Sequence, residues 1–281
     1  MDTRVADLHS HSLCSDGSDT PAALVRLARG AGLNALALTD HDTVAGLAEA
    51  RAEAAACGLE LIPGIELSCT DGTHDIHLLA YWVDTGNAEL LAALRHRQAQ
   101  RLQRLDAVIA RLGERGITIT REMVLQIAGG ASVGRPHIAR ALIQQGAVAT
   151  VDEAFKRFLG DDAPCYVQNN ELSSAEAIGL IRRSGGVPVV AHPVYLRDDT
   201  VIERLCAEGL AGVEAFHGSH APSVAQRYVA LAGRLGLLVA GGSDYHGAHK
   251  PEGAPLGGVR LPYEHVEALR AWKDTHSTSV A

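Results

Sequence analysis

The chain has 281 residues, of which 47% are hydrophobic and 21% charged, so it can bury a full core. A formal net charge of -8 argues against general affinity for nucleic acids, and five widely spaced cysteines argue against a disulfide framework or a zinc ribbon. No stretch approaches the roughly 20 apolar residues of a membrane span. The chain begins without a charged and apolar leader, so we expect a cytoplasmic protein with no membrane contact and no stable protein partner.

Seven short apolar runs, each ending in polar residues, are predicted to be strands. They lie at 5–11, 34–42, 60–68, 73–83, 186–193, 209–217 and 236–246. Amphipathic segments of helical length separate most of them, at 21–31, 45–56, 174–184, 199–208 and 222–235. This alternation predicts an α/β fold with a parallel sheet, either closed into a barrel or open and doubly wound.

Residues 86–165 break the alternation, because about eighty residues there have a helical pattern. We expect an inserted helical cap on a barrel formed by 1–85 and 166–281. Its first helix carries a buried stripe at spacings of three and four, consisting of Leu91, Leu94, Leu102, Leu105, Ile109 and Leu112. An adjacent face carries Arg97, Arg101, Arg104, Arg111 and Arg115.

These arginines belong to a basic region, since residues 95–157 hold eleven Arg/Lys against five Asp/Glu. Such a region would attract an anionic substrate. The alternative is that the arginines lie on a solvated helix face, where the aliphatic parts of their side chains cover the core.

Candidate metal ligands stand at or near the ends of the predicted strands. His9 and His11 are two residues apart on a strand, so both imidazoles project to the same side. Asp16 follows in the loop after this strand. The other predicted strands supply His41, Glu66, His77, His192, Asp244 and His246, and the sixth supplies Glu214 and His217. The carboxyl ends of parallel strands converge on one face. Nine mixed donors fit two or three ions better than one tetrahedral zinc, and imidazoles with carboxylates favour Mn, Fe or Zn.

Other residues near these positions have less specific interpretations. Asp7 and Asp40 either orient the imidazoles beside them or form strand-end turns and helix caps. His74 is a weaker ligand candidate. The histidines expected at the surface are His96, His220, His249, His265 and His276.

Five segments, DLHSHSLCSDGS, TDHDT, GIELS, AHP and GGSDYH, together resemble the PHP (polymerase and histidinol phosphatase) family. They occur in that family's order and span almost the entire chain. The resemblance implies a distorted seven-stranded (β/α) barrel that binds two or three divalent ions, most often Mn²⁺ with Fe²⁺ or Zn²⁺ as alternatives, and hydrolyses phosphate esters. It implies that Glu66 bridges two ions, and that Asp16 stands where some members have His. The implied ligands are His9, His11, Asp16, His41, Glu66, His77, His192, Asp244 and His246.

The predicted cap contains GRPHIA at 134–139, which resembles the branch of the family that acts on nucleotides and short RNA ends. This implies that Arg135 and His137 hold phosphate or ribose, with Arg101 and Arg104 as further candidates. The alternative is a helix start with Pro136 in its first turn and Arg135 in solvent.

The predicted activity is therefore removal of the 3′-phosphate from a 3′,5′-nucleoside bisphosphate, with His217 contacting the phosphoryl group or protonating the departing ribose oxygen. Two phosphates on one small ligand would explain why a metal cluster and a basic cap occur together. A 5′–3′ exonuclease on short oligonucleotides and a histidinol phosphatase are alternatives that use the same parts. A metal-dependent amidohydrolase or a non-catalytic binding module would be different classes of protein.

Overall fold

The computed structural model describes residues 3–168, 172–250 and 252–276, and its centre is a curled eight-stranded sheet in the order β7-β6-β5-β4-β3-β2-β1-β8. The backbone N–H of Leu8 donates to the carbonyl of Gly241 at 3.0 Å, which brings the end of β1 against β7 and nearly closes the barrel. All seven predicted strands are confirmed. The strands are β1 (Val5–Asp7), β2 (Ala35–Leu38), β3 (Glu60–Thr70), β4 (Asp75–Tyr81), β5 (Val187–Val190), β6 (Gly212–His217), β7 (Leu238–Gly242) and β8 (Leu261–Pro262).

The barrel differs from the predicted parallel, seven-stranded one in two ways. β8 is an additional short strand that pairs antiparallel with β1. β4 runs antiparallel to both β3 and β5, so the sheet is mixed. The reason is the turn after β3, where Asp71 Oδ1 accepts from the backbone N–H groups of Thr73 and His74. This tight turn leaves no room for the crossover helix that a parallel pair needs.

Helices cover the barrel much as predicted, with α1 (Pro21–Gly30), α2 (Leu47–Cys57), α7 (Ser174–Arg183), α8 (Thr200–Ala207) and α9 (Pro222–Leu235). Local sequence explains where they begin. Thr20 stands just before Pro21, and its Oγ1 accepts a hydrogen bond from the backbone N–H of Ala23. Ser173 forms a capping box with Glu176 at the start of α7.

The sequence analysis missed one helix, α10 (Tyr263–His276), which follows β8. It contacts β1, β5, β7 and β8, and its Val266 and Leu269 join a hydrophobic cluster with residues of these strands. Because Tyr263 hydrogen-bonds the carbonyl of Arg4 before β1, α10 lies at the barrel end where that strand begins. The carboxyl ends of the parallel strands are left at the opposite end.

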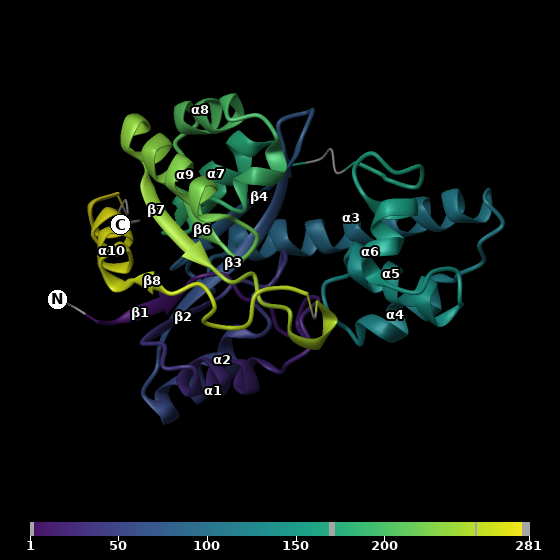
Figure 1. Cartoon of the computed structure of the whole chain (residues 1–281), viewed down its shortest axis with the longest axis horizontal. Coiled ribbons are helices and arrows are strands. Elements are labelled where there is room, and N and C mark those ends of the chain that lie inside the picture. Colours follow the sequence, from purple (N-terminus) through teal and green to yellow (C-terminus); the bar gives the residue numbers. More distant parts are fainter. Residues whose placement is uncertain (1–2, 169–171, 251, 277–281) are drawn as a thin grey trace.

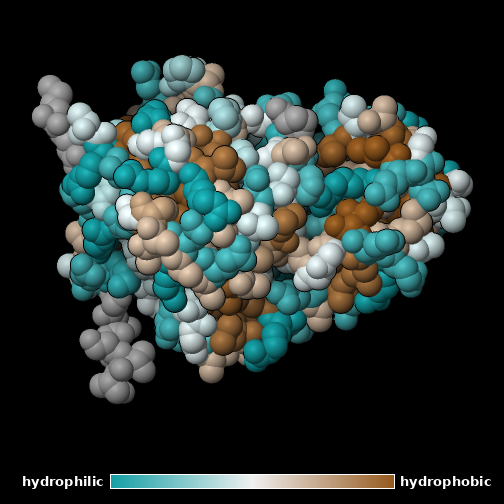
Figure 2. Space-filling model, turned by 90° about the horizontal axis from the view of Figure 1, so that it is seen from below, coloured by the Kyte–Doolittle hydropathy of each residue, from teal (hydrophilic) through white to brown (hydrophobic). Residues whose placement is uncertain are grey.

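The insert after β4 contains α3 (Ala88–Gly113), α4 (Arg121–Ala128), α5 (Arg135–Gln144), α6 (Val151–Ala154) and the π-helix η1 (Phe155–Leu159). These helices form the lobe at the right of Figure 1 and have their own hydrophobic cluster, which includes Leu112 and Leu142. α3 joins the two lobes, because Leu90 and Leu94 pack in the barrel core whereas Leu105 packs in the cap. Hydrophobic residues also reach the surface of this lobe (Figure 2). Among the described helices, none has the length and apolar character needed to cross a bilayer.

We predict that the Leu142→Ala substitution lowers the free energy of unfolding by about 2–5 kcal/mol, because the side chain is fully buried in the cap. Urea unfolding measures this loss. The control is Leu125→Ala on α4, where the side chain is 37% exposed and the cost should be about 1 kcal/mol or less. Equal effects of the two substitutions would contradict a packed cap core.

Candidate metal centre

The nine predicted ligands come together at the end of the barrel where the parallel strands finish. His9 and His11 follow β1, and His41 follows β2. Potential ligand atoms lie within 4.8 Å of one another in four groups. The groups are His11, Asp16, His41 and His246; His9, His11, Glu66 and Asp244; His9, Glu214 and His217; and His41, Glu66 and His77.

His77 reaches this end of the barrel by a route that the sequence analysis did not foresee. It was expected near the end of its strand, but it lies in the first half of β4. Because β4 is antiparallel to β3, its beginning lies at the edge where parallel strands end, and His77 pairs in register with Ser68. Glu66 is likewise within β3 rather than at its end.

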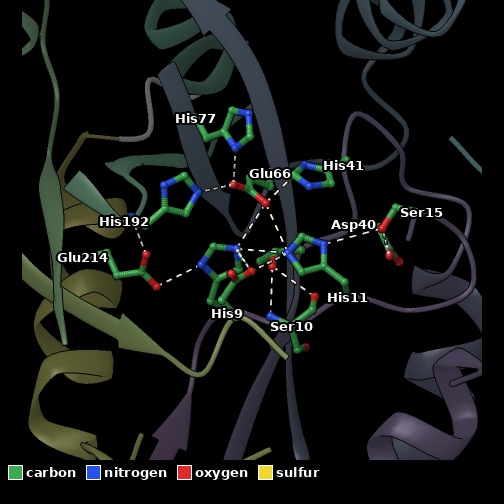
Figure 3. A network of polar contacts seen from close by, with 12 residues as sticks. His9, Ser10, His11, Ser15, Asp40, His41, Glu66, His77, His192 and Glu214 are labelled. Carbon is green, nitrogen blue, oxygen red and sulfur yellow. Dashed lines mark hydrogen bonds and ion pairs between the residues drawn. The ribbon is translucent and has the colours of Figure 1, made fainter. Parts of the chain in front are cut away.

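Glu66 occupies the middle of the cluster and is only 1% exposed (Figure 3). Its Oε2 lies 3.1 Å from His9 Nε2 and 3.2 Å from His11 Nε2. Its Oε1 lies 2.7 Å from His77 Nδ1 and 2.9 Å from His192 Nε2. Oε2 also lies 3.2 Å from His41 Nδ1. One carboxylate therefore presents its two oxygens to two separate groups of imidazoles, as a ligand shared by two ions would.

Asp16 faces a second group of imidazoles at distances longer than hydrogen bonds. Its Oδ1 lies 3.3 Å from His246 Nε2, and its Oδ2 lies 3.7 Å from His41 Nε2. Asp16 Oδ1 is buried and lacks a hydrogen-bond partner in the described part of the chain. An unpaired buried carboxylate oxygen is costly, so this position fits a cation that would complete the contacts.

The protonation equilibria show that the cluster favours positive charge. Burial raises the pKa of Glu66, but His41, His77 and His9 hold it well below its usual range. Burial lowers the pKa of His11, yet Asp244 and Glu66 raise it to about 10, whereas burial lowers the pKa of His41 to about 3. A divalent ion binds neutral imidazoles and carboxylates and can take the place of a proton such as that on His11. The mixture of imidazole and carboxylate donors fits several ions such as Mn, Fe or Zn.

Unusual backbone conformations position two of these residues. His192 has φ of 27° and Asp244 has φ of 53°, values in a region that non-glycine residues seldom adopt and that costs energy. Gly242, at the end of β7, lies so close to β1 that an added Cβ would be 2.3 Å from the backbone nitrogen of His9. The absence of a side chain at Gly242 lets Asp244 lie beside the histidines of β1.

Glu214, on β6, positions two of the histidines at once. Its Oε1 accepts from His9 Nδ1 at 2.9 Å, and its Oε2 accepts from the backbone N–H of His192 at 2.6 Å (Figure 3). Because His9 donates its Nδ1 proton to this carboxylate, its Nε2 lone pair is left for an ion. The sequence analysis placed Glu214 near the site only through its strand.

Asp7 and Asp40 do not bond the imidazole rings directly. Asp7 accepts from the backbone N–H groups of His9 and Ser243, so it fixes β1 against the end of β7. Asp40 accepts from the Ser12 and Ser15 hydroxyls in the loop that carries Asp16. Asp7 therefore joins two strands and Asp40 holds the Asp16 loop, and in the described contacts neither side chain caps a helix.

Two histidines expected at the surface lie near the site instead. His249 lines the cleft beside the cluster, and its Nδ1 lies 3.0 Å from the Asp16 carbonyl oxygen. The ring of His220 lies 5.2 Å from that of His217. The folding of the segment after β7 back over the Asp16 loop brings His249 inward, and no local pattern signals this. His74 bonds Asp71 in the β3–β4 turn.

His217 is buried and lies behind Asp244 relative to the cleft. Ser219 donates its backbone N–H to His217 Nδ1, so a neutral His217 carries its proton on Nε2. Nε2 lies 3.5 Å from Asp244 Oδ2. In this geometry His217 can act on the site through the Asp244 carboxylate, and its direct contact with substrate stays a prediction.

A cleft of about 620 Å³ lies between the cluster and the cap, within the ordinary range for small-molecule sites of about 300–1,000 Å³. Arg101, Arg104 and Arg135 line it, whereas His137 does not. His137 is buried, and its Nδ1 accepts from the backbone N–H of Gly134 at the start of α5. Its contact with substrate stays a prediction.

Arg101 connects the cap to the barrel. Its Nε donates to Asp42 Oδ2 at 2.6 Å, its Nη1 to the Val133 carbonyl, and its Nη2 to Ser68 Oγ.

Lys250 was not foreseen from the sequence. It lines the cleft and contacts Asp244 Oδ2 at 2.7 Å.

The barrel and its buried cluster define a hydrolase built to hold several divalent metal ions. A family model described as PHP domain matches residues 7–160, and the chain belongs to that family. It is a metal-dependent phosphoesterase of the PHP family, as the resemblance in sequence predicted.

Three relatives share about a third of their residues with this chain. A 3′,5′-nucleoside bisphosphate phosphatase of Chromobacterium violaceum is 36% identical, over 85% of this chain and 86% of its own. The 5′–3′ exoribonuclease Rnm of Escherichia coli is 34% identical, over 86% of this chain and 85% of its own. A phosphoribosyl 1,2-cyclic phosphate 1,2-diphosphodiesterase of Eggerthella lenta is 32% identical, over 92% of this chain and 99% of its own. A crystal structure from Bifidobacterium adolescentis superposes with a TM-score of 0.87 at 33% identity, covering 96% of both chains.

We predict that Glu214→Gln weakens Mn²⁺ binding by about 10- to 100-fold, the usual cost of losing a group that orients a ligand. A glutamine can accept from only one of the two N–H groups that Glu214 now binds, so either His9 or His192 loses its support. Isothermal titration of chelator-treated protein measures this affinity. Glu267→Gln, at an exposed ion pair with Arg4, is the matched control and should leave it unchanged. An unchanged affinity in Glu214→Gln would show that the carboxylate does not position ligands.

Proposed function

We propose that this phosphoesterase removes the 3′-phosphate of 3′,5′-nucleoside bisphosphates, such as adenosine 3′,5′-bisphosphate, to give a 5′-mononucleotide and phosphate. The observation that supports the proposal is that Arg104 and Arg135 line the cleft that also contains the metal-ligand cluster, where they could bind a second anion. A substrate with two phosphates can occupy both positions at once.

Arg104 is a cation that lacks full compensation. Burial and the neighbouring Arg135 guanidinium lower its pKa to about 10, so it stays charged at neutral pH at some cost in free energy. Its Nη2 lies 3.3 Å from Asp75 Oδ2, but its Nε is buried and has no hydrogen-bond partner among the described residues. A phosphate would supply an acceptor and a compensating charge.

Arg135 can exchange its present partner for a phosphate. Its Nη1 contacts Asp161 Oδ1 at 2.7 Å, and that aspartate side chain is 58% exposed. An exposed ion pair contributes little, typically about 0.2–1 kcal/mol. Arg135 therefore loses little when its guanidinium turns to a doubly charged ligand.

Divalent ions held by the nine ligands, with Mn²⁺ proposed first and Fe²⁺ or Zn²⁺ as alternatives, would activate water and neutralise charge on the phosphoryl oxygens. Arg104 and Arg135 would hold the 5′-phosphate and so fix the distance at which the 3′-phosphate meets the cluster. Lys250 would donate to a phosphoryl oxygen, because its ammonium already lies beside Asp244 at the cleft. His217 stays the candidate for delivering a proton to the departing ribose oxygen, with the proton on Nε2.

A second candidate function is 5′–3′ exonuclease action on short RNA. Tyr195, which is 55% exposed, lines the cleft together with Arg197 on the barrel side. These two residues offer an aromatic face and a charge to a further nucleotide. Histidinol phosphate is a weaker candidate, because it has no second phosphate for Arg104 and Arg135.

We predict that the Mn²⁺-loaded protein releases phosphate from adenosine 3′,5′-bisphosphate faster than it releases mononucleotides from a short 5′-phosphorylated RNA. Arg135→Ala should lower kcat/KM for the bisphosphate by about 10- to 100-fold, mainly through KM, because hydrogen bonds to charged groups are worth about 1.5–3 kcal/mol. Hydrolysis of p-nitrophenyl phosphate, which has a single phosphate, should be unchanged. Arg157→Ala, at an exposed cap ion pair with Glu153, is the control.

Faster cleavage of the RNA would favour the exonuclease instead. If Arg135→Ala lowers kcat/KM equally for adenosine 3′,5′-bisphosphate and for p-nitrophenyl phosphate, this arginine does not bind a second phosphate.

A further inference from the structure

The cleft lined by Arg104 and Arg135 also has an apolar wall, which the cap supplies. Leu105 and Val108 of α3, Ile138 of α5, Val151 of α6 and Phe155 of η1 form this wall. The first three are almost fully buried in the cap core, so Val151 and Phe155, which are partly buried, present most of its accessible surface. A phosphorylated sugar alone has no apolar group to place on such a wall.

Phe155 has a conformation that sets it apart from the other apolar residues of the wall. It begins the π-helix η1, in which the Gly160 backbone N–H donates to the Phe155 carbonyl at 2.8 Å. Short π-helical turns are rare and are frequent at functional sites. In this turn Phe158 and Leu159 remain buried in the cap core, whereas Phe155 stays half-buried and borders the cleft.

The aromatic ring also lies beside the proposed phosphate position. The Arg135 guanidinium is 5.7 Å from the centre of the Phe155 ring and 5.5 Å from that of Tyr166. A 5′-phosphate on Arg135 would therefore leave the base of the same nucleotide within reach of Phe155. Base–aromatic stacking requires a flat, accessible ring face and is tolerant of base identity.

We infer that this apolar wall is a nucleobase-binding subsite in which Phe155 stacks on the base, so that the enzyme selects ligands carrying a base over bare phosphorylated sugars. This inference rests on the proposed nucleotide substrate. It separates this chain from a catalyst of phosphoribosyl compounds, which have no base to place on the wall.

The test uses binding, so that it does not depend on turnover. Adenosine 5′-monophosphate and ribose 5-phosphate share the 5′-phosphate and the sugar but differ in the base. Titration of each into the Mn²⁺-loaded protein should give a dissociation constant for the nucleotide at least about fivefold lower, because base stacking contributes about 1–3 kcal/mol. Phe155→Ala should remove most of this preference and leave ribose 5-phosphate binding unchanged.

Two further variants keep the result interpretable. Phe155→Trp retains a flat ring and should preserve the preference. Unchanged ribose 5-phosphate binding by Phe155→Ala excludes a loss caused by misfolding of that variant. Tyr195→Ala removes the other aromatic residue of the cleft and should not affect the preference. Equal affinities for the two ligands in the wild-type protein would overturn the inference, as would a preference that depends on Tyr195 and not on Phe155.

The outcome is distinguishable from failure of the proposed function. If the protein binds the nucleotide through Phe155 but leaves the bisphosphate intact, the subsite stands and the proposed reaction fails. If it hydrolyses the bisphosphate without a preference for the base, the reaction stands and the subsite fails.

Discussion

Carboxylates and imidazoles buried together at one end of the barrel impose the constraint on which the rest of the structure depends. Glu66, Asp16 and Asp244 are each almost fully buried, and histidines surround them at distances of about hydrogen-bond length or slightly more. Charges of this kind cannot stay in a low-dielectric interior without compensation. Divalent ions held by these residues would provide that compensation, and the same ions would supply the chemistry of phosphate-ester hydrolysis.

The barrel supplies the rigidity that this cluster requires. Gly242 allows β7 to approach β1, and Glu214 on β6 holds His9 after β1 and His192 after β5. The strained backbone at Asp244 persists because the surrounding strands fix it. The cap places cations and apolar side chains across the cleft from the cluster, where they would recognise the substrate. The buried pair of Arg101 with Asp42 joins these two parts directly beside the cluster. In the proposed function, substrate recognition and metal binding share one cleft between the barrel and a cap that has its own hydrophobic core.

Much of this arrangement could be predicted from sequence, because the strands end in residues with metal-binding side chains. The strand ends at His9, His41 and His192 identified the site, and the helical pattern of 86–165 identified the insert. The direction of β4 was not predictable from periodicity, which is the same in parallel and antiparallel strands. The direction of β4 depends on the Asp71 turn. This antiparallel direction explains why His77 lies early in its strand.

The roles of Glu214, His249 and Lys250 could not be predicted either, because each depends on a contact between segments far apart in sequence. Glu214 bonds His9 across the barrel, and no local pattern distinguishes such a residue from a ligand. The same limit applies to Arg101, whose contacts with Asp42 and Ser68 arise only when the cap is placed on the barrel.

The central claim is that one shared cluster of ligands binds several ions, with Glu66 between them. Elemental analysis of protein purified without chelator and reloaded with Mn²⁺ tests it most directly. The account predicts two or three ions per chain in the wild-type protein and fewer in Glu66→Gln, while Glu60→Gln, on the same strand but bonded to Arg270 and Tyr263, keeps the full number. Less than one ion per chain in the wild-type protein, or an unchanged number in Glu66→Gln, would contradict it.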